Sequence, residues 1–539
     1  MGDRTLFIPP HVGDNVLPNL PFFHRLLRYA QRKPSPIVVR DLVAGMEKTY
    51  HHLISDVLAF RKTLEKSLSK EARHDLIADK EVYIGLLAPG GYEYTVGFIA
   101  ILAIGAAVVP MAAILPAEEA SYFLSKAQCV ALVAGTTSEK TAQSIARYME
   151  ESKGVHIPCI SPIASHLRPT LLPSDQATIS SGPVPDMNAA ALVIFTSGTT
   201  GPPRVLCSVA VIYPGTERRM QSFTKSQTRT QFFMSSRCIT PLVVDMGALA
   251  TGGLTFFSGV PTIYMRMMRY YEENIAHQTP EIRDQYISGA RQIRAMLCGT
   301  SALPGPVQEF WHQIRNKPIL TRYGATEFGA VIKTELDSDG TPQNSVGRVA
   351  EAVSLKLTDE GQILVKCPYM FSKYLFDEKA TADAHDSEGY FKTGDIARRE
   401  GKYYFILGRA SIDIIKSGGY KISALDIERE ILGLDYASEV MVVGVEDEEF
   451  GQRVAATVSL KQGQKITRKS LTLAELREDL RSRMAGYKMP TILRVVQGEL
   501  PKSGTGKVQK KILGPQFFPP NYRELPEVQV WSKENTAKL

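Results

Sequence analysis

A run of small and hydroxyl-bearing residues interrupts the chain directly after an apolar stretch. Ile194 and Phe195 are followed by TSGTTG and then by two prolines. Glycine lets a backbone approach a ligand closely, and the N–H groups and hydroxyls of such a loop can surround an anion. Taken alone, a short polar pattern of this kind is more often a surface turn. As a phosphate-binding loop, it would consist of Thr196, Ser197, Gly198, Thr199, Thr200 and Gly201.

Four further motifs follow this loop in order and favour the phosphate-binding interpretation. They are RYGATEFG at 322–329, YFKTGDIARREGKYYFILGR at 390–409, IIKSGGYKISALDIE at 414–428 and PKSGTGKVQKK at 501–511. Together the five motifs resemble the adenylate-forming superfamily of acyl-CoA synthetases, adenylation domains and luciferases, from about residue 20 to about residue 515. Within it, GRASIDIIKSGGYKISALDIERE and GVEDEEFGQRVAA are most similar to the malonyl-CoA synthetase branch.

The resemblance implies an α/β fold with two domains. A large N-terminal α/β AMP-binding domain would span residues 1–408, and a small mobile C-terminal α+β domain would span residues 409–539. The residue pattern agrees, because 82–110 reads as a strand–helix–strand unit. In the second part, 439–460 predicts a hairpin around an acidic turn. Thr472 begins a capping box there, ahead of a helix expected to stop at Gly486.

The resemblance also implies the reaction, namely ATP-dependent ligation of a carboxylic acid to CoA through an acyl-adenylate. ATP and Mg²⁺ would be the cofactors and CoA the co-substrate. The TSGTTG loop would hold the β- and γ-phosphates, and Thr326 would hydrogen-bond the α-phosphate. Glu327 would hold Mg²⁺, a cation that prefers oxygen ligands. Tyr323, followed by Gly324, would offer a flat face to adenine.

Two further segments are implied to border the nucleotide. Gly299, Thr300 and Ser301 follow a predicted strand and resemble the family segment beside the nucleotide and the acyl pocket, with contacts made through the backbone. Asp395 stands where the family binds both ribose hydroxyls. Arg409 would supply a second contact to ribose or phosphate.

The last two motifs are implied to act in different half-reactions, between which the small domain rotates. The pivot would lie just after Arg409, and either Ser411 or Asp413 could be the pivot residue. Gly418 and Gly419 would let the pantetheine arm of CoA pass, with an ordinary β-turn as the alternative. Lys507 would place its charge between the substrate carboxylate and the α-phosphate in the transition state, with a solvated lysine as the alternative.

The chain departs from the family after the phosphate loop. The usual Lys-Gly is replaced by Arg204 and Val205, and no histidine occurs between His166 and His277, where relatives carry one that lines the acyl pocket. The interval 205–259 also contains GTERRMQSFTKSQTRTQFFMSS, which is polar where core strands are expected. A deletion or a mistranslated gene segment would produce this pattern.

The expected substrate is a small or medium-chain carboxylic acid, with malonate as the first choice. Arg266 follows the strand–helix junction that borders the family's acyl pocket, and it is the candidate partner of a second carboxylate, with a solvated helix arginine as the alternative. Two other functions stay open. One is a nucleotide-binding protein that has lost ligase activity, and the other is an adenylating enzyme that loads a separate carrier protein.

Composition excludes several other classes of partner. The net charge of +7 is spread along the chain, so no nucleic-acid partner is expected. Six dispersed cysteines without metal-ligand spacing predict reduced thiols of an intracellular protein. The most apolar stretch, 96–109, is too short to span a membrane.

The ending Ala537-Lys538-Leu539 differs from the peroxisomal SKL address only by Ala for Ser. It predicts a peroxisomal location, with a peroxisomal import receptor as partner, and without such import the protein would be cytoplasmic.

Overall fold

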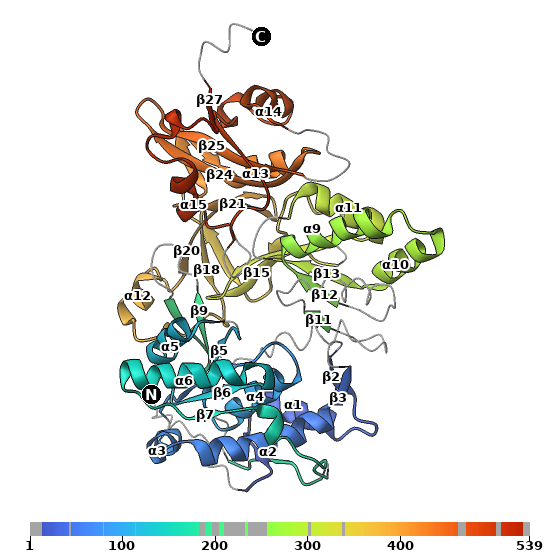
Figure 1. Cartoon of the computed structure of the whole chain (residues 1–539), viewed down its shortest axis with the longest axis vertical. Helices are drawn as coiled ribbons and strands as arrows, with labels where there is room; N and C mark the ends of the chain where they lie inside the picture. The colour runs from blue at the N-terminus through green and yellow to red at the C-terminus, as the bar shows by residue number, and fades with distance from the viewer. Residues whose placement is uncertain are drawn as a thin grey trace. The chain divides into compact units, whose positions relative to one another are not determined.

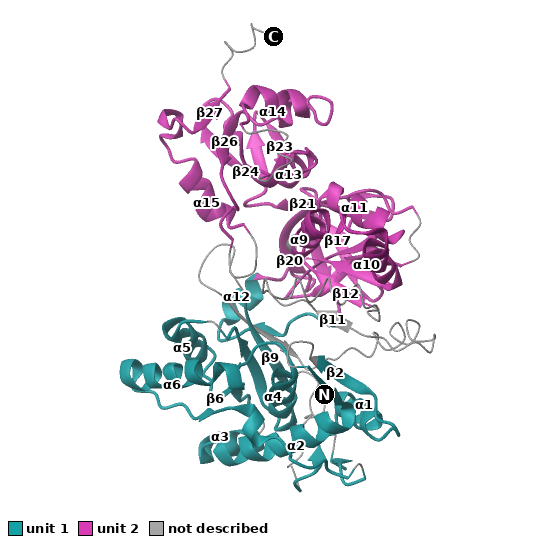
Figure 2. Ribbon diagram, turned by 45° about the vertical axis from the view of Figure 1, so that its right-hand side comes forward, with its two compact units in different colours: residues 1–226, 369–383 teal, residues 227–368, 384–539 magenta. Residues whose placement is uncertain are grey.

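The chain divides into two compact units, which are coloured separately in Figure 2. Unit 1 comprises residues 1–226 and 369–383, and unit 2 comprises residues 227–368 and 384–539. The predicted domain boundary between residues 408 and 409 falls inside unit 2 and stays a prediction. The structure, a computed structural model, describes residues 13–41, 45–78, 80–113, 115–173, 175–182, 189–196, 204–209, 232–234, 256–299, 303–336, 340–461, 470–502 and 508–531.

Unit 1 contains a seven-stranded sheet in the order β19-β10-β9-β5-β4-β6-β7. The five strands from β9 to β7 run parallel, and β10 and β19 add on antiparallel at one edge. The predicted strand–helix–strand unit is confirmed as β4, α4 and β5. The strands are β4 Tyr83–Leu87, β5 Ala107–Met111, β6 Ala131–Ala134, β7 Cys159–Ile160, β9 Ala190–Thr196, β10 Arg204–Val209 and β19 Lys373–Tyr374.

Helices cover both faces of this sheet, and its central strands β4, β5 and β6 are apolar at every position. In β4, Ile84 and Leu86 pack into one core with α2 and α4, whereas Leu87 packs into a second core with α5 and α6. Alternate residues of a strand point to opposite faces, so a strand buried on both sides lacks a polar face. The helices of this unit are α1 Pro21–Ala30, α2 Tyr50–Ser67, α3 Lys70–Ile77, α4 Tyr92–Ala103, α5 Ala117–Lys126, α6 Glu139–Lys153 and α12 Glu378–Asp383.

Short elements complete unit 1. Two small pairs lie outside the main sheet, one parallel between β1 and β8 and one antiparallel between β2 and β3. Among the described residues between α6 and β9, no element is longer than four residues. These minor elements are β1 Val16–Leu17, β2 Ile37–Asp41, β3 Met46–Thr49, β8 Thr178–Ile179, η1 Thr136–Ser138 and η2 Ile163–His166.

The first sheet of unit 2 has the order β11-β12-β13-β14-β15-β16. Its strands run parallel as far as β14 and antiparallel from there on. The strands are β11 Phe232–Met234, β12 Phe256–Gly259, β13 Ala295–Cys298, β14 Ile319–Ala325, β15 Gly329–Lys333 and β16 Arg348–Val349. The associated helices, green in Figure 1, are α9 Pro261–Tyr270, η3 Tyr271–Ile275, α10 Pro280–Gln292 and α11 Gly305–Arg315.

A four-stranded antiparallel sheet follows in the order β17-β18-β20-β21. Its strands are β17 Ser354–Leu357, β18 Gln362–Lys366, β20 Phe391–Glu400 and β21 Tyr403–Arg409. The pairing of β20 with β21 sets Asp395 opposite Arg409. Two residues of the 390–409 motif, fourteen positions apart in the chain, therefore meet through strand register.

The C-terminal part of unit 2 forms its own sheet, in the order β23-β22-β25-β26-β27 with β24 paired to β25. The hairpin predicted at 439–460 is confirmed as β24 and β25. The strands are β22 Ile414–Ser417, β23 Tyr420–Ser423, β24 Ala437–Asp447, β25 Gly451–Leu460, β26 Ile492–Val496 and β27 Val528–Val530. The helices are α13 Ala424–Leu432, α14 Leu473–Leu480, η4 Gly486–Lys488, α15 Lys510–Phe517 and η5 Tyr522–Glu524.

The capping box at Thr472 is confirmed, since its side chain and that of Glu475 bond each other's backbone N–H. The predicted end of this helix at Gly486 was wrong, because α14 stops at Leu480. The N–H of Met484 still bonds the Leu480 carbonyl, so the apolar pattern continues through a turn after the helix has ended. None of the helices within the described ranges is long and apolar enough to cross a bilayer.

Candidate active site

Asp395 is the centre of the best-defined polar site. Its carboxylate accepts a hydrogen bond from the Tyr323 hydroxyl at 2.7 Å through Oδ2, and Arg409 Nε lies 2.9 Å from Oδ1. Asp395 is 8% exposed and Tyr323 is 9% exposed. The two hydrogen-bonding partners come from β14 and β21, so the site joins two sheets of unit 2.

Neighbouring backbone contacts hold the Asp395 carboxylate in place. Thr393 donates its hydroxyl to the Ile363 carbonyl at 2.8 Å and accepts the Asp395 N–H at 3.0 Å. Burial, followed by the charge of Asp395, raises the pKa of Tyr323 well above its usual range. Tyr323 is therefore a hydrogen-bond donor at neutral pH. Nearby, the Arg409 side chain is 36% exposed and can be reached from solvent.

This arrangement is suited to binding a pair of hydroxyl groups. A carboxylate is an acceptor with several lone-pair sites, and hydrogen bonds to an ionised group are stronger than neutral ones. A ribose carries two adjacent hydroxyls, and an adjacent guanidinium adds a donor for ribose or phosphate oxygens. The ring of Tyr323 packs against Phe328 with 5.9 Å between centroids, and its predicted contact with adenine stays a prediction.

The hairpin between β14 and β15 presents the next two predicted residues. Thr326 is exposed and Glu327 is half-buried, and both lie on the turn that follows β14. Gly324 is required there, because a Cβ at its position would stand 2.0 Å from the Gly329 carbonyl oxygen. A carboxylate beside a hydroxyl is a donor set that fits Mg²⁺, which binds one or two carboxylates together with substrate phosphates and water.

Several predicted residues lie outside the described part of the chain. Gly299 is described: it follows β13, and a Cβ there would meet Arg322 Cγ at 3.2 Å. The structure describes the backbone of Thr196 as the last residue of β9. The roles predicted for the others stay predictions; these residues are Ser197, Gly198, Thr199, Thr200, Gly201, Thr300, Ser301 and Lys507.

Gly418 and Gly419 form the two-residue turn between β22 and β23. Their φ angles are +55° and +84°, and Ser417 pairs with Tyr420 across the turn. Positive φ at both central residues is typical of a tight hairpin, which is enough to account for two glycines. Apart from its chain neighbours, no heavy atom of the described residues lies within 4 Å of a Cβ placed on Gly419, so the turn also leaves room for a ligand.

Arg266, the predicted partner of a second carboxylate, has an internal partner. Its guanidinium lies 3.6 Å from Glu499 Oε2, and the two side chains are 36% and 52% exposed. Sequence reasoning overlooked Arg322, although RYGATEFG begins with it. Arg322 is half-buried on β14, and burial lowers the pKa of its guanidinium. No acidic side chain of the described residues forms an ion pair with it, and Cys298 and Tyr264 are its neighbours.

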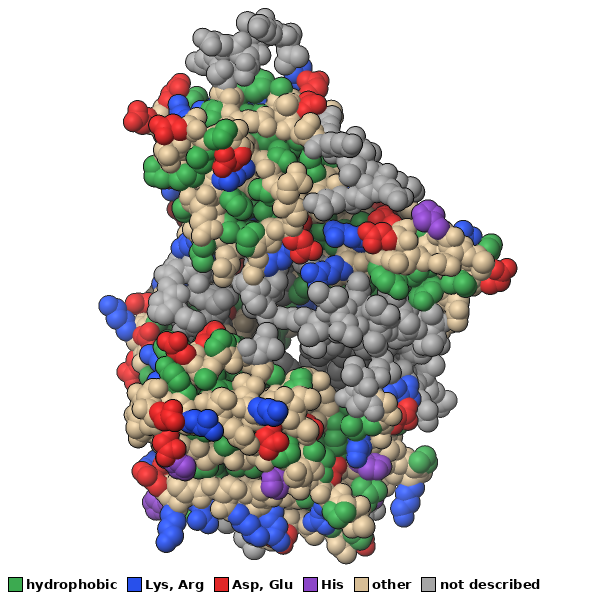
Figure 3. Space-filling model, in the orientation of Figure 1, with side chains coloured by type: hydrophobic (Ala, Val, Ile, Leu, Met, Phe, Trp, Pro, Cys, Tyr) green, Lys and Arg blue, Asp and Glu red, His purple; other side chains and the backbone are tan. Residues whose placement is uncertain are grey.

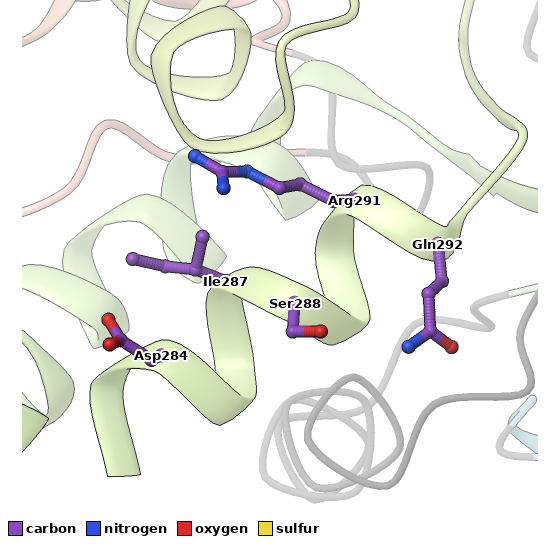
Figure 4. Close-up of a pocket in the computed structure, with 5 residues that line it drawn as sticks. All are labelled: Asp284, Ile287, Ser288, Arg291 and Gln292. Carbon is purple, nitrogen blue, oxygen red and sulfur yellow. The ribbon is translucent and has the colours of Figure 1, made fainter. Parts of the chain in front are cut away.

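Other surface features lack the predicted site residues. A pocket of 530 Å³ is lined by five residues of α10, and Figure 4 shows all five side chains leaving one helix. On the face drawn in Figure 3, basic and acidic side chains are interspersed over the described surface.

Among the described residues, no group of three or more His, Cys, Asp or Glu side chains is placed to hold a metal ion. Within the described part of the chain, Cys129, Cys159 and Cys298 are free thiols.

Two sequence profiles match most of the chain. The profile described as AMP-binding enzyme matches residues 27–207 and 231–375, and the profile described as AMP-binding enzyme C-terminal domain matches residues 426–507. The gap at 208–230 falls inside the interval 205–259 that departs from the family pattern.

Curated relatives and solved structures agree with these matches. An acyl-CoA ligase of Aspergillus oryzae is 30% identical over 94% of this chain and 93% of its own length. A mitochondrial malonate–CoA ligase of Xenopus laevis is 31% identical over 81% of this chain and 83% of its own length. Among solved structures, ATP-bound MatB of Rhodopseudomonas palustris aligns with a TM-score of 0.73 and 21% identity, covering 95% of this chain and all of that one.

Proposed function

The chain belongs to the AMP-binding enzyme family, and on this premise we propose that it is an ATP-dependent carboxylic acid:CoA ligase that works through an acyl-adenylate. The observation that carries the proposal is the contact of Asp395 with both Tyr323 and Arg409. Residues from two motifs, separated by 72 positions, meet there as a ribose-binding site requires. The likeness to the Aspergillus ligase over nearly the whole chain supports the same reaction.

The first half-reaction joins the acid to AMP. A carboxylate oxygen of the acid attacks the α-phosphorus of ATP, the bond to the β-phosphate oxygen breaks, and pyrophosphate leaves. Asp395 and Arg409 hold the ribose, while Thr326 bonds the α-phosphate. Glu327 would hold Mg²⁺, which neutralises phosphate charge when bound. Lys507 stabilises the charge that builds on the α-phosphate in the transition state.

The second half-reaction transfers the acyl group to CoA. The sulfur attacks the acyl carbon, AMP leaves with the electrons of the acyl–oxygen bond, and the thiol proton passes to solvent. Gly418 and Gly419 leave open space for the pantetheine arm, since both are exposed and no non-adjacent heavy atom in the described ranges lies within 4 Å of a Cβ placed on Gly419.

We propose a small dicarboxylic acid of the malonate type as the substrate. The Xenopus malonate–CoA ligase supports this class, and Arg322 supplies a chemical reason for it. A half-buried guanidinium is costly to leave without an anion, because burial disfavours its charged form. Arg322 directly precedes Tyr323 in β14 and lies against Gly299, beside two predicted nucleotide segments. A second carboxylate of the substrate would pair with it bidentately.

A nucleotide-binding protein without ligase activity is the second candidate. The residues 208–230, which the profile does not match, favour it, because they fall in the interval where the family resemblance implies part of the acyl pocket. In that case ATP would bind at Asp395, but no acid would be adenylated. The carrier-loading alternative differs only in the acceptor, which would be a protein thiol in place of CoA.

One experiment separates these functions. Purified protein is given ATP, Mg²⁺ and a series of mono- and dicarboxylic acids of equal chain length, with and without CoA, and pyrophosphate and thioester are measured. We expect pyrophosphate release with malonate and acyl-CoA formation when CoA is added. ATP binding without adenylation of any acid would overturn the ligase proposal. Adenylation without CoA thioester would favour a carrier protein as acceptor.

The substrate class is tested with a matched pair of variants. Arg322→Ala should raise the KM for malonate far more than the KM for a monocarboxylate of similar size, because only the former loses an ion pair. Arg266→Ala is the comparison, since its guanidinium already pairs with Glu499. If Arg266→Ala selectively raises the KM for malonate and Arg322→Ala does not, the second carboxylate pairs with Arg266, as the sequence predicted.

A peroxisomal location also stays a proposal. It depends on recognition of Ala537, Lys538 and Leu539 by an import receptor, and these residues lie outside the described part of the chain.

A further inference from the structure

A buried cluster of three charged side chains lies next to the Asp395 site. Lys510, the first residue of α15, places Nζ 2.7 Å from Asp413 Oδ1 and 2.7 Å from Glu428 Oε1. The side chains of Lys510 and Asp413 are each 12% exposed, and that of Glu428 is 13% exposed. One ammonium group therefore joins three segments that are far apart in the sequence.

The charges of this cluster are satisfied internally. Burial by itself lowers the pKa of Lys510, but the carboxylates of Glu428 and Asp413 outweigh it and the net direction is upward, so the ammonium stays protonated at neutral pH. Burial raises the pKa of Glu428. Glu428 Oε1 also accepts the N–H of Val442 at 2.7 Å. These hydrogen bonds and ion pairs balance the charges of the three side chains and also fix their positions relative to one another.

Asp413 links the cluster to the turn that follows Arg409. Its Oδ2 accepts the Arg409 N–H at 3.0 Å, while its own N–H bonds the Arg409 carbonyl at 2.8 Å. Gly408 is needed beside it, because a Cβ there would stand 2.3 Å from Asp413 Cβ. Arg409 in turn holds Asp395. A continuous chain of contacts thus runs from the ribose-binding carboxylate to α15.

Lys510 also fixes the chain close to Lys507. Lys510 lies three positions after Lys507, so their Cα atoms are at most about 11 Å apart. Val508 is described and forms an isolated antiparallel bridge with Lys502, whose ammonium pairs with Glu439. The chain on the C-terminal side of Lys507 is therefore held by both a backbone bridge and the buried cluster.

We propose that Lys510 is a positioning residue for adenylation: by holding Asp413 and Glu428 together, it fixes the chain that carries Lys507 relative to the Arg409 turn and the Asp395 site. The inference rests on the proposed ligase function. Replacing a buried ion pair with apolar side chains is often neutral for stability, so stability alone does not account for the cluster. Its hydrogen bonds and ion pairs instead hold α15 and the turn after Arg409 in a fixed relative position.

The test measures each half-reaction separately in Lys510→Met. Adenylation is followed by ATP–pyrophosphate exchange with the acid that the parent enzyme accepts best. Thioester formation is followed from synthetic acyl-adenylate and CoA. We expect adenylation to fall by about 10²-fold, the scale of a misplacement of about 1 Å at a reacting group. Thioester formation should stay near the parent rate, and Lys510→Arg should recover part of the lost adenylation because it restores the cation.

A matched control lies at the other end of the same helix. Arg494 donates to the carbonyl of Phe517, the last residue of α15, and pairs with Glu527 at 2.9 Å, but it does not contact the Arg409 turn. Arg494→Met should therefore affect the two half-reactions equally. If Lys510→Met does not fold, Asp413→Asn decides the matter, since it keeps the shape of the side chain and removes the charge that faces Lys510.

Three outcomes would overturn the inference. They are an equal loss of both half-reactions in the Lys510 or Asp413 variant, an unchanged rate of adenylation in either folded variant, and the same selective loss in Arg494→Met. Failure of the proposed function is distinguishable from these, because the parent protein would then adenylate no acid at all. With an active parent enzyme, the variants test only the role of Lys510.

Discussion

The hydroxyl of Tyr323 offers the sharpest test of the Asp395 site. Tyr323→Phe removes the hydrogen bond to Asp395 and leaves the ring packed against Phe328. Both bonded residues are less than 10% exposed, at 9% and 8%, so water does not replace the lost donor. A hydrogen bond to a charged group contributes about 1.5–3 kcal/mol. If all of this energy were lost from ATP binding, the affinity for ATP would fall by roughly 10–150-fold, at about 1.4 kcal/mol per factor of ten.

The expected effect on ATP is near the lower end of this range. Arg409 still holds the other carboxylate oxygen at 2.9 Å, so Asp395 loses one of its two described side-chain contacts. We expect the KM for ATP to rise about tenfold, measured by pyrophosphate release, and the free energy of unfolding in urea to fall by about 1.5–3 kcal/mol. The KM for the carboxylic acid should not change.

Tyr92→Phe is the matched control for this variant. The Tyr92 hydroxyl donates to Asp56 Oδ2 at 2.6 Å, and each residue is 3% exposed, but the pair lies in the core of unit 1. Tyr92→Phe should lower the free energy of unfolding by an amount similar to that of Tyr323→Phe and leave the KM for ATP unchanged. If Tyr323→Phe lowers stability without any change in the KM for ATP, Asp395 does not bind the nucleotide and the reasoning about the site is wrong.

Four further predictions concern other parts of the chain. Lys507→Ala should slow adenylation by about 10²-fold or more and spare thioester formation from acyl-adenylate; Gly419→Leu should do the reverse, with Gly498→Leu as a control of similar φ, +77°, and equally open surroundings. Cys298 should resist alkylation of the native protein at pH 8, because burial raises its pKa from 9.0 to about 12 and so lowers its thiolate fraction by about 10³-fold; rapid labelling found by peptide mass mapping would contradict this. A fluorescent fusion that ends in residues 537–539 should enter peroxisomes, and a cytosolic signal would refute the targeting proposal.

The sequence by itself indicated a candidate chemistry for most of the predicted site residues, because each motif is local. Glycines and hydroxyls within six residues predict an anion-binding loop from local sequence alone, and that assignment stays a prediction. The hairpin of β24 and β25 and the capping box at Thr472 were also predictable, since turn and cap signals depend on neighbours only a few positions away. The end of α14 was not, because an apolar pattern continues through a turn as well as through a helix.

The partners of these residues were decided by the tertiary structure. Arg266 and Glu499 are separated by more than two hundred positions, and no local pattern indicates that they form an ion pair. The burial of Arg322 depends on the strands and helix around it, although its position in a motif was visible. The basic sequence around Lys510 suggests a solvated lysine, yet its ammonium group pairs with two carboxylates inside the fold. Local spacing specifies which groups are available, whereas strand register and packing determine which of them meet, because those contacts join residues that the chain itself keeps far apart.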